Sequence, residues 1–373
     1  MNEAPARGPR ILILTEGQLG DLLLLTPAIR GIKTSHPDAS LLLLVVERRG
    51  SGTDRSKILD RSLHNVLSSN PHISALYSLR RDLLRELTGI RRLLEEARIV
   101  RFLRAMKPDS VISAFPEDRF ALWAFASGAS VRIGEISNVL RWVYNRTPER
   151  KKGDGSILDY YCELAELTGS HISSFNTEYF PNAEAERWAD GFLDATGFRT
   201  GKFVVVHPGA TGDYKIWPAE RYREMIARLT EGTGLSVLLC GGPGDREVVD
   251  EVAGEFRSPA LRVHIEENID HLASLLHRAA LVISNDSGPR HLAVSVGTPS
   301  LAVFRHHHDR EWGVYPASEK IRTAKALTAC PVCPPGRCND MIPEGSRYGS
   351  VCLRAVPVQE VVTLASQMLV SGS

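Results

Sequence analysis

The residues with the clearest chemical pattern run from Asp286 to His291, in the order Asp-Ser-Gly-Pro-Arg-His. An apolar run, 281–283, precedes them and predicts a buried strand, and apolar residues at helical spacing follow them. Ser287 is the expected N-cap of that helix, with Pro289 near its first position. A tight turn that opens a helix exposes backbone N–H groups and a positive dipole end, which suits a phosphate. Asp286 and His291 then stand where they can contact hydroxyl groups beside it.

Corners of this kind recur in α/β folds, so the turn alone does not identify a site. Two further loops in the same half of the chain strengthen the prediction. The expected strand 204–207 runs into a glycine-containing loop, 208–218, which carries Lys215. The expected strand 235–240 runs into a second glycine-rich loop, 241–247. Because ligands of open α/β sheets bind at the carboxyl ends of the strands, we expect the three loops to converge on a nucleotide site between residues 207 and 305.

The amino-terminal half offers one acid at a comparable position. Asp21 follows an expected strand, 11–14, and stands at the entrance of a helix expected over 22–33. It is a candidate general base, although an acid in a first turn can also simply stabilise the helix dipole. The glycines there, Gly17 and Gly20, lack the G-x-G-x-x-G spacing of dinucleotide-binding domains. This argues against a Rossmann oxidoreductase.

With these residues in view, the sequence resembles glycosyltransferase family 9, the bacterial heptosyltransferases that build the lipopolysaccharide core. Each of the blocks that carry the resemblance is weak alone, but together they are specific. Their order and rough spacing match the family over about residues 10–370. The four blocks are 19–30, 207–210 with 215–218, 241–243, and 285–293.

The resemblance implies a GT-B fold, in which two Rossmann-like α/β domains face each other across a cleft. It implies an amino-terminal acceptor-binding domain, 10–172, and a carboxyl-terminal nucleotide-sugar-binding domain, 183–356. A terminal helix, 357–370, is expected to pack back on the amino-terminal domain. Family members are inverting enzymes without a catalytic metal, and most use ADP-L-glycero-β-D-manno-heptose as the donor.

The resemblance also assigns roles to residues. Asp21 matches the proposed general base, and Lys215 matches the lysine that contacts the donor phosphate. An acid in the loop 241–247 should take the ribose hydroxyls, and the choice between Asp245 and Glu247 stays open. The residues expected to bind the donor are Gly20, Thr211, Lys215, Asp245, Glu247, Asp286, Ser287, Gly288 and His291.

The chemistry needs these groups irrespective of the family. Inverting transfer is a single in-line displacement at the anomeric carbon, through an oxocarbenium-like transition state. A base must take the proton of the acceptor hydroxyl, and an aspartate with an ordinary pKa of about 4 is ionised at neutral pH. A cation or dipole must stabilise the leaving diphosphate. Lys215 and the helix start at Ser287 can do this, so we expect no cofactor for catalysis.

Several alternatives remain open. After the strand 301–304, relatives usually show a glycine-rich turn, whereas this chain has Arg-His-His-His-Asp-Arg at 305–310. The exact donor sugar is therefore not fixed. The acceptor could be a lipopolysaccharide-core glycan, another glycan, a natural product or a protein side chain. A nucleotide-sugar-binding protein without transfer activity, or a transferase of another nucleoside diphosphate sugar, would carry much the same loops.

A group of cysteines near the carboxyl terminus forms a separate pattern, C-x₂-C-x₄-C-x₁₃-C. Four thiolates at this spacing fit a closed tetrahedral site for structural zinc or iron. A branch of the family that acts on bacterial autotransporters has a four-cysteine iron site in this region. Free or partly paired thiols are the alternative. The four residues are Cys330, Cys333, Cys338 and Cys352.

Composition limits the remaining possibilities. The 373 residues carry a formal net charge of +1, so no overall field favours nucleic acid as a partner. The longest apolar run, 41–46, is far short of the ~20 residues of a membrane-spanning helix, so we expect a cytoplasmic protein.

The segment 80–107 is basic and has apolar residues at helical spacing, from Leu83 to Ala97. It is either a domain helix with a solvated basic face or a contact to a lipid-linked acceptor at the inner membrane.

Overall fold

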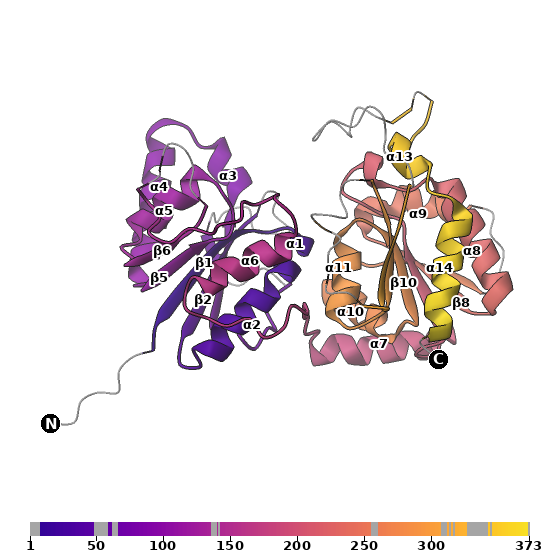
Figure 1. The fold of residues 1–373 in the computed structure, drawn as a ribbon. Helices are drawn as coiled ribbons and strands as arrows, with labels where there is room; N and C mark the ends of the chain where they lie inside the picture. Colours follow the sequence, from indigo (N-terminus) through magenta and orange to yellow (C-terminus); the bar gives the residue numbers. More distant parts are fainter. Residues whose placement is uncertain are drawn as a thin grey trace. The chain divides into compact units, whose positions relative to one another are not determined.

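The computed structural model describes residues 8–47, 59–61, 66–135, 140, 142–254, 260–306, 312, 315, 318–326, 342–343 and 345–371 (Figure 1). The chain divides into two compact units, Met1–Thr177 and Glu178–Ser373. In each unit the described strands form one six-stranded sheet with helices packed on it. Two α/β units with largely parallel sheets confirm the predicted fold class.

The sheet of the first unit has the strand order β3-β4-β2-β1-β5-β6. All neighbours are parallel except β3, which runs antiparallel to β4 at one edge. The central strands are nearly continuous runs of buried leucine, isoleucine and valine, as expected where helices cover both faces of a sheet. The strands are β1 (Arg10–Glu16), β2 (Ser40–Glu47), β3 (Leu59–Arg61), β4 (Ala75–Arg80), β5 (Ser110–Ser113) and β6 (Val131–Ile133).

The single helix expected over 22–33 is in fact two helices. The first begins three residues earlier and ends before Leu25, and the second has Pro27 in its first turn, where a missing N–H costs little. Asp21 therefore lies in the first turn of α1 rather than ahead of the helix. The helices of this unit are α1 (Leu19–Leu24), α2 (Thr26–Ser35), α3 (Arg81–Glu86), α4 (Gly89–Ala105), α5 (Asp118–Ala126) and α6 (Ile157–Glu166).

The basic segment 80–107 forms α3 and α4, which are separated by residues 87 and 88. Gly89, where φ is +54°, is the first residue of α4. The apolar face expected for it is not the buried one. On α4 only Ile99 and Leu103 are buried, whereas Ile90 and Leu94 are 74% and 58% exposed. The helix turns a different stripe toward the sheet, so its amino-terminal half presents both apolar and basic side chains to solvent.

The sheet of the second unit is parallel throughout, in the order β12-β11-β10-β7-β8-β9. The chain builds β7, β8 and β9 outward in one direction, then returns to place β10 on the other side of β7. This is the order of a doubly wound dinucleotide fold, with its switch point between β7 and β10. In the first unit the corresponding point lies between β1 and β5. The strands are β7 (Phe203–His207), β8 (Ser236–Gly241), β9 (Leu261–Ile265), β10 (Leu281–Asn285), β11 (Ser300–Phe304) and β12 (Ile321–Lys325).

The terminal helix α14 belongs to the core of the second unit. Its buried residues Val361 and Ala365 lie in one cluster with Trp217 and Tyr222, and the helix packs on α8 and on β10 to β12. The apolar face of α14 thus covers the second sheet. The helices are α7 (Ala183–Thr196), η1 (Asp213–Lys215), α8 (Ala219–Thr233), η2 (Pro243–Asp245), α9 (Arg246–Ala253), α10 (Ile269–Arg278), α11 (Gly288–Ser295), α13 (Val351–Arg354) and α14 (Val358–Ser371).

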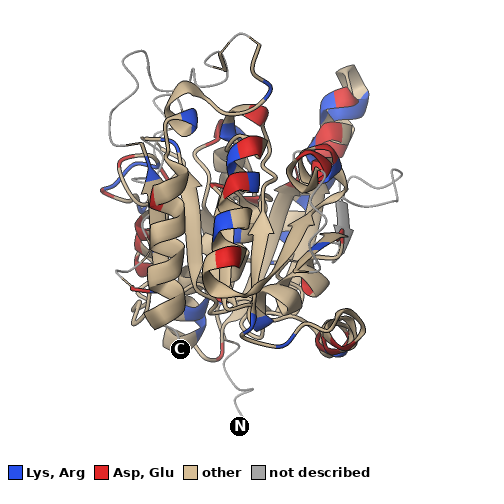
Figure 2. Ribbon diagram, turned by 90° about the vertical axis from the view of Figure 1, so that its right-hand side faces the viewer, with Lys and Arg blue, Asp and Glu red and all other residues tan. Residues whose placement is uncertain are grey.

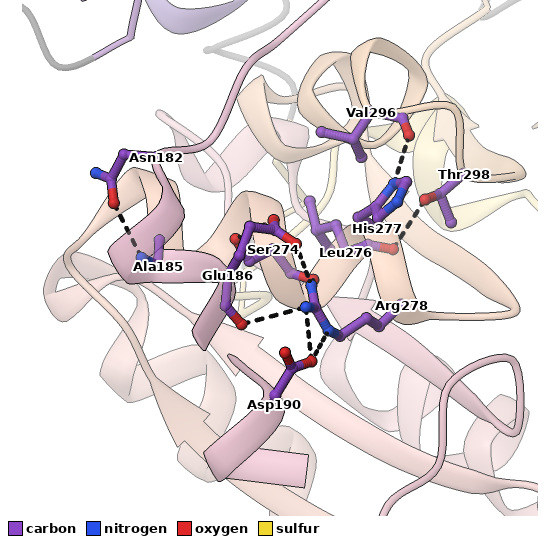
Figure 3. Close-up of polar contacts among 10 residues, drawn as sticks. All are labelled: Asn182, Ala185, Glu186, Asp190, Ser274, Leu276, His277, Arg278, Val296 and Thr298. Carbon is purple, nitrogen blue, oxygen red and sulfur yellow. Dashed lines mark hydrogen bonds and ion pairs between the residues drawn. The ribbon is translucent and has the colours of Figure 1, made fainter. Parts of the chain in front are cut away.

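An ion-pair network fastens α7, the first helix of the second unit, to α10 (Figure 3). Arg278 donates from Nε to Asp190 at 2.8 Å and from Nη1 to Glu186 at 2.9 Å. Nη1 also donates to the carbonyl oxygen of Ser274 at 3.0 Å. Asn182 caps α7 by accepting the N–H of Ala185 at 2.9 Å. The start of the second unit is thereby fixed to α10.

Charges of both signs alternate along the surface helices, whereas α14, which ends at the carboxyl terminus, carries almost none (Figure 2). This distribution agrees with the net charge of +1. Among the described helices, none combines the length and the apolar character that crossing a bilayer would require.

Candidate active site

In the first unit, Asp21 is the centre of a small polar cluster. Its side chain is almost buried, with 7% of the residue exposed. Tyr161 of α6 donates its hydroxyl hydrogen to Asp21 Oδ1 at 3.0 Å. Lys152 Nζ lies 3.8 Å from the same oxygen and donates to the Tyr161 hydroxyl at 3.2 Å. One carboxylate oxygen is thus held by a hydrogen bond and a nearby positive charge.

The two strands beside the switch point of the first sheet lead to Asp21 and to Phe115, which contacts Lys152. After β1, the Gly17 N–H donates to the Val46 carbonyl at 3.1 Å. The chain then enters the first turn of α1, which contains Gly20 and Asp21. Phe115 follows β5, and its ring centroid lies 3.7 Å from Lys152 Nζ. The ring face attracts the ammonium group and fixes it next to the acid.

Tyr161 is a hydrogen-bond donor at neutral pH. Its pKa lies well above the usual value of 10, first because burial disfavours the phenolate and second because Asp21 is negative. Neither Tyr161 nor Lys152 was among the residues predicted from the sequence. They are 140 and 131 positions from Asp21 in the chain, and no local motif marks them.

In the second unit, Asn285 joins two of the three expected loops. It is the last residue of β10 and is completely buried. Its Oδ1 accepts the Trp217 N–H and the Tyr222 hydroxyl, each at 2.9 Å, and its Nδ2 donates to the Pro208 carbonyl at 2.5 Å. The loop after β7 and the turn after β10 therefore meet beside the switch point, where open α/β sheets bind ligands.

A distant part of the chain supports the segment that carries Lys215. The N–H groups of Gly349 and Ser350 donate to the carbonyls of Asp213 and Tyr214, at 3.0 and 3.1 Å. The short helix η1 is thus tied to the residues before α13, and Lys215 at its end is half-buried. Thr211, in the same loop, is exposed.

His291, in α11, is buried and uncharged at neutral pH. Its Nδ1 lies 2.5 Å from the Tyr315 hydroxyl. Burial lowers its pKa well below 6.5, and the positive charges of Arg290 and Lys215 lower it further. Lys215 therefore lies near His291, which places the lysine and the helix turn at the same end of the sheet.

α11 begins at Gly288, as predicted, with Ser287 at the N-cap position and Pro289 in the first turn. Within the described chain the Ser287 side chain does not cap the helix, and its Oγ lies 3.5 Å from the Asn285 carbonyl oxygen. Asp286 beside it is buried. The first-turn N–H groups are thus left without the usual side-chain acceptor, as an anion site requires.

The structure separates the two acids of the third loop. Asp245 Oδ2 accepts the Gly242 N–H at 2.9 Å and lies 3.8 Å from His207 Nε2 at the end of β7. A Cβ atom at Gly209 would come within 2.1 Å of the Asp245 carboxyl carbon, so only glycine permits this approach. Glu247, by contrast, is 69% exposed and pairs with Arg347.

The expected metal site lies largely outside the described residues, which include neither Cys330, Cys333 nor Cys338. Cys352 is buried in α13 and belongs to the apolar cluster of the second unit. Within the described part of the chain, no group of histidine, cysteine and acidic side chains is arranged to hold a metal ion.

Two doubly wound units, with an acid in the first turn of α1 in one and glycine-containing loops beside the switch point in the other, are typical of glycosyltransferases of the GT-B class. Comparison with known proteins agrees. Residues 97–332 match the family described as glycosyltransferase family 9 (heptosyltransferase). The chain belongs to this family.

Individual relatives are distant. Lipopolysaccharide heptosyltransferase 3 of Escherichia coli (strain K12) is 26% identical over 303 residues, which cover 76% of this chain and 79% of the relative. A family 9 glycosyltransferase from Veillonella parvula has a similar structure, with a TM-score of 0.75 and 21% identity over 97% of both chains. The structure of E. coli heptosyltransferase WaaC with ADP-2-deoxy-2-fluoro heptose is also similar, with a TM-score of 0.67 and 19% identity. The match covers 96% of this chain and 99% of that one. At these identities the structures show the shared fold.

Proposed function

We propose that this glycosyltransferase moves a heptose from ADP-heptose to a hydroxyl group of a lipopolysaccharide-core-like glycan. The meeting of Lys215, Asp286 and His291 at the switch point of the second sheet is the main support. The names of the relatives agree, since one is a lipopolysaccharide heptosyltransferase and another was solved with an ADP-heptose analogue. We assign donor binding to the domain 183–356 and acceptor binding to the domain 10–172.

In the proposed mechanism Asp21 takes the proton of the acceptor hydroxyl as its oxygen attacks the anomeric carbon. Tyr161 and Lys152 hold the carboxylate in place, so little reorganisation is needed when it receives the proton. The bond between the anomeric carbon and the diphosphate breaks, and the configuration inverts. Lys215 and the N–H groups of Ser287 and Gly288 stabilise the departing diphosphate.

Around the donor, we assign the ribose hydroxyls to Asp245 rather than Glu247. Asp245 lies against the loop after β7, whereas Glu247 faces solvent in an ion pair. Asp286 and His291 are assigned to sugar and phosphate oxygens. Gly20 and Thr211 are also assigned to donor binding.

Calorimetric titration with ADP, GDP, UDP and CDP, followed by a transfer assay with ADP-heptose, tests the donor. ADP should bind at least tenfold more tightly than the others, which is about 1.4 kcal/mol. A tenfold preference for UDP or GDP would contradict the ADP-heptose donor and point to another nucleoside diphosphate sugar. Tight ADP-heptose binding with no transfer to lipopolysaccharide-core, glycan, small-molecule or protein acceptors would indicate a binding protein instead.

We place the reaction in the cytoplasm, with the first unit at the inner membrane. Ile90, Leu93 and Leu94 of α4 are all more than half exposed, and Arg91 and Arg92 lie among them. Apolar and basic side chains together bind the surface of anionic bilayers. Co-sedimentation with phosphatidylglycerol vesicles should exceed that with phosphatidylcholine vesicles. Replacing Arg91 and Arg92 by glutamine should abolish the difference, and replacing the three apolar residues by serine should weaken binding to both vesicles. Equal binding to both vesicles would contradict the contact.

We further propose that Cys330, Cys333, Cys338 and Cys352 hold one structural zinc or iron ion. Four thiolates within one segment are the donor set that such ions prefer. Metal analysis of the purified protein should give about one ion per chain, and Cys333→Ser should release it and lower the melting temperature. Four titratable thiols in metal-free, folded protein would contradict the site.

A further inference from the structure

Arg305 lies at the end of β11, beside the turn that opens α11. β11 pairs with β10 in parallel register, with Val303 opposite Asn285. Arg305 therefore leaves the sheet at the same edge as Asp286 and Ser287. Only 4% of the residue is exposed. Arginine is rarely buried to this extent unless its charge is paired, so its contacts need an explanation.

The described contacts leave the charge of Arg305 poorly compensated. The nearest described carboxylate oxygen is Asp286 Oδ2, 4.0 Å from Nη2, well beyond the ~2.8 Å of a charge-assisted hydrogen bond. The guanidinium carbon lies 4.9 Å from the centre of the Tyr214 ring. Among the described residues, Nε is buried and has no hydrogen-bond partner.

These contacts direct the guanidinium toward the anion site. Tyr214, on which it stacks, precedes Lys215, and Asp286, which it approaches, precedes the N-cap of α11. A planar guanidinium binds two oxygens of a phosphate at once, which an ammonium group does not. A diphosphate carries more negative charge than Lys215 and the amino terminus of α11 together can compensate.

We propose that Arg305 binds the diphosphate of the nucleotide sugar as a second cation beside Lys215. The assignment rests on the proposed function in that the ligand is a nucleoside diphosphate. It makes affinity depend on the number of phosphates rather than on the base. The same contact stabilises the diphosphate when it leaves with its electron pair from the anomeric carbon.

Calorimetric titration of adenosine, AMP, ADP and inorganic pyrophosphate into the wild type, Arg305→Gln and Arg305→Lys tests the proposal. Arg305→Gln should weaken ADP and pyrophosphate at least tenfold and leave adenosine unchanged. The affinity of Arg305→Lys for ADP and pyrophosphate should lie between those of the wild type and Arg305→Gln. Lysine keeps the positive charge but cannot bind two phosphate oxygens at once as the planar guanidinium does. Arg228→Gln, which removes an exposed arginine paired with Glu224 on α8, is the matched control and should bind like the wild type.

The outcomes separate this proposal from the proposed function. If the wild type prefers ADP and both Arg305 variants bind ADP and pyrophosphate equally well, the Arg305 assignment is wrong and the donor assignment stands. If pyrophosphate binding depends on Arg305 but ADP is not the preferred nucleotide, the Arg305 assignment stands and the donor assignment is wrong. If Arg305 only positioned Asp286, the variants would lose affinity for ADP-heptose and keep it for ADP, which also overturns the proposal.

Discussion

At the scale of single residues, the chemistry depends most on Asp21. Asp21→Asn keeps the size of the side chain and its acceptor oxygen but cannot take a proton. We expect turnover to fall by roughly 10²- to 10⁴-fold, the usual value of general-base catalysis, while donor affinity stays within a few fold. Steady-state kinetics and ADP titration of the same preparation measure both. Unchanged turnover would remove Asp21 from the mechanism.

The contact between Tyr161 and Asp21 makes a second prediction. Tyr161→Phe removes a hydrogen bond to the ionised carboxylate, and such a bond favours the charged form. The acid limb of the kcat/KM profile should therefore move to higher pH, with turnover falling about tenfold. Tyr160→Phe is the control, because Tyr160 is equally buried and precedes it in α6. An identical pH profile in the Tyr161 variant would mean that the tyrosine only fills space.

Lys215 is expected to contact charge in both the bound donor and the transition state. Lys215→Ala should therefore weaken ADP binding and reduce kcat/KM together, because uniform and differential binding are both lost. Lys202→Ala, a change at an exposed residue just before β7, should change neither quantity. ADP affinity equal to that of the wild type would show that Lys215 is a solvated loop residue.

At the scale of elements, Asn285 holds two loops in one place. Asn285→Ala would leave the Trp217 N–H, the Tyr222 hydroxyl and the Pro208 carbonyl without their partner. We expect a loss of about 2–4 kcal/mol in unfolding free energy, since each buried unpaired group costs ~1–3 kcal/mol and relaxation recovers part. ADP affinity should fall as well, because the loop carrying Lys215 loses its anchor.

Tyr222→Phe is the matched control for this element. It removes one of the three hydrogen bonds and leaves Asn285 bonded to the loop after β7 at Trp217 and Pro208, so about 1 kcal/mol should be lost and ADP affinity kept. Urea denaturation and calorimetry of both variants distinguish the cases. Equal ADP affinity in Asn285→Ala and the wild type would show that the loops keep their positions without the asparagine.

At the scale of the whole molecule, two buried histidines couple folding to pH. Burial lowers the pKa of both His207 and His291 below 6.5, so the unfolded chain binds more protons than the folded one under mildly acidic conditions. Stability should therefore be full above pH 6.5 and decline as the pH falls toward 5. Each histidine contributes a slope of up to ~1.4 kcal/mol per pH unit.

Urea midpoints measured between pH 7.5 and 5 test this coupling. His291→Asn should flatten the decline, because asparagine takes up no proton on unfolding. His171→Asn, a change at an exposed histidine, should leave the slope as it is. A wild-type midpoint that does not change over this range would contradict the prediction.

Much of this molecule could be predicted from the sequence. The α/β class and the loops after β7, β8 and β10 could be predicted from local patterns. A buried strand, a turn of small residues and a helix start follow one another directly in the sequence at each of these loops. The same holds for Asp21, which follows β1 at the start of α1. Each of these features depends on neighbours in the chain, so one stretch of sequence contains all that is needed to recognise it.

The remaining features depend on contacts between distant residues, and only the tertiary structure decided them. Lys152 and Tyr161 reach Asp21 because α6 packs against α1 and α2, and nothing near Asp21 in the sequence indicates this. Asp245 lies against Gly209 while Glu247 faces solvent, although both follow the same strand. The stripe of α4 that is buried also differs from expectation. Strand order and helix packing determine these contacts. The hydrophobic periodicity of one segment does not indicate which other segment it packs against.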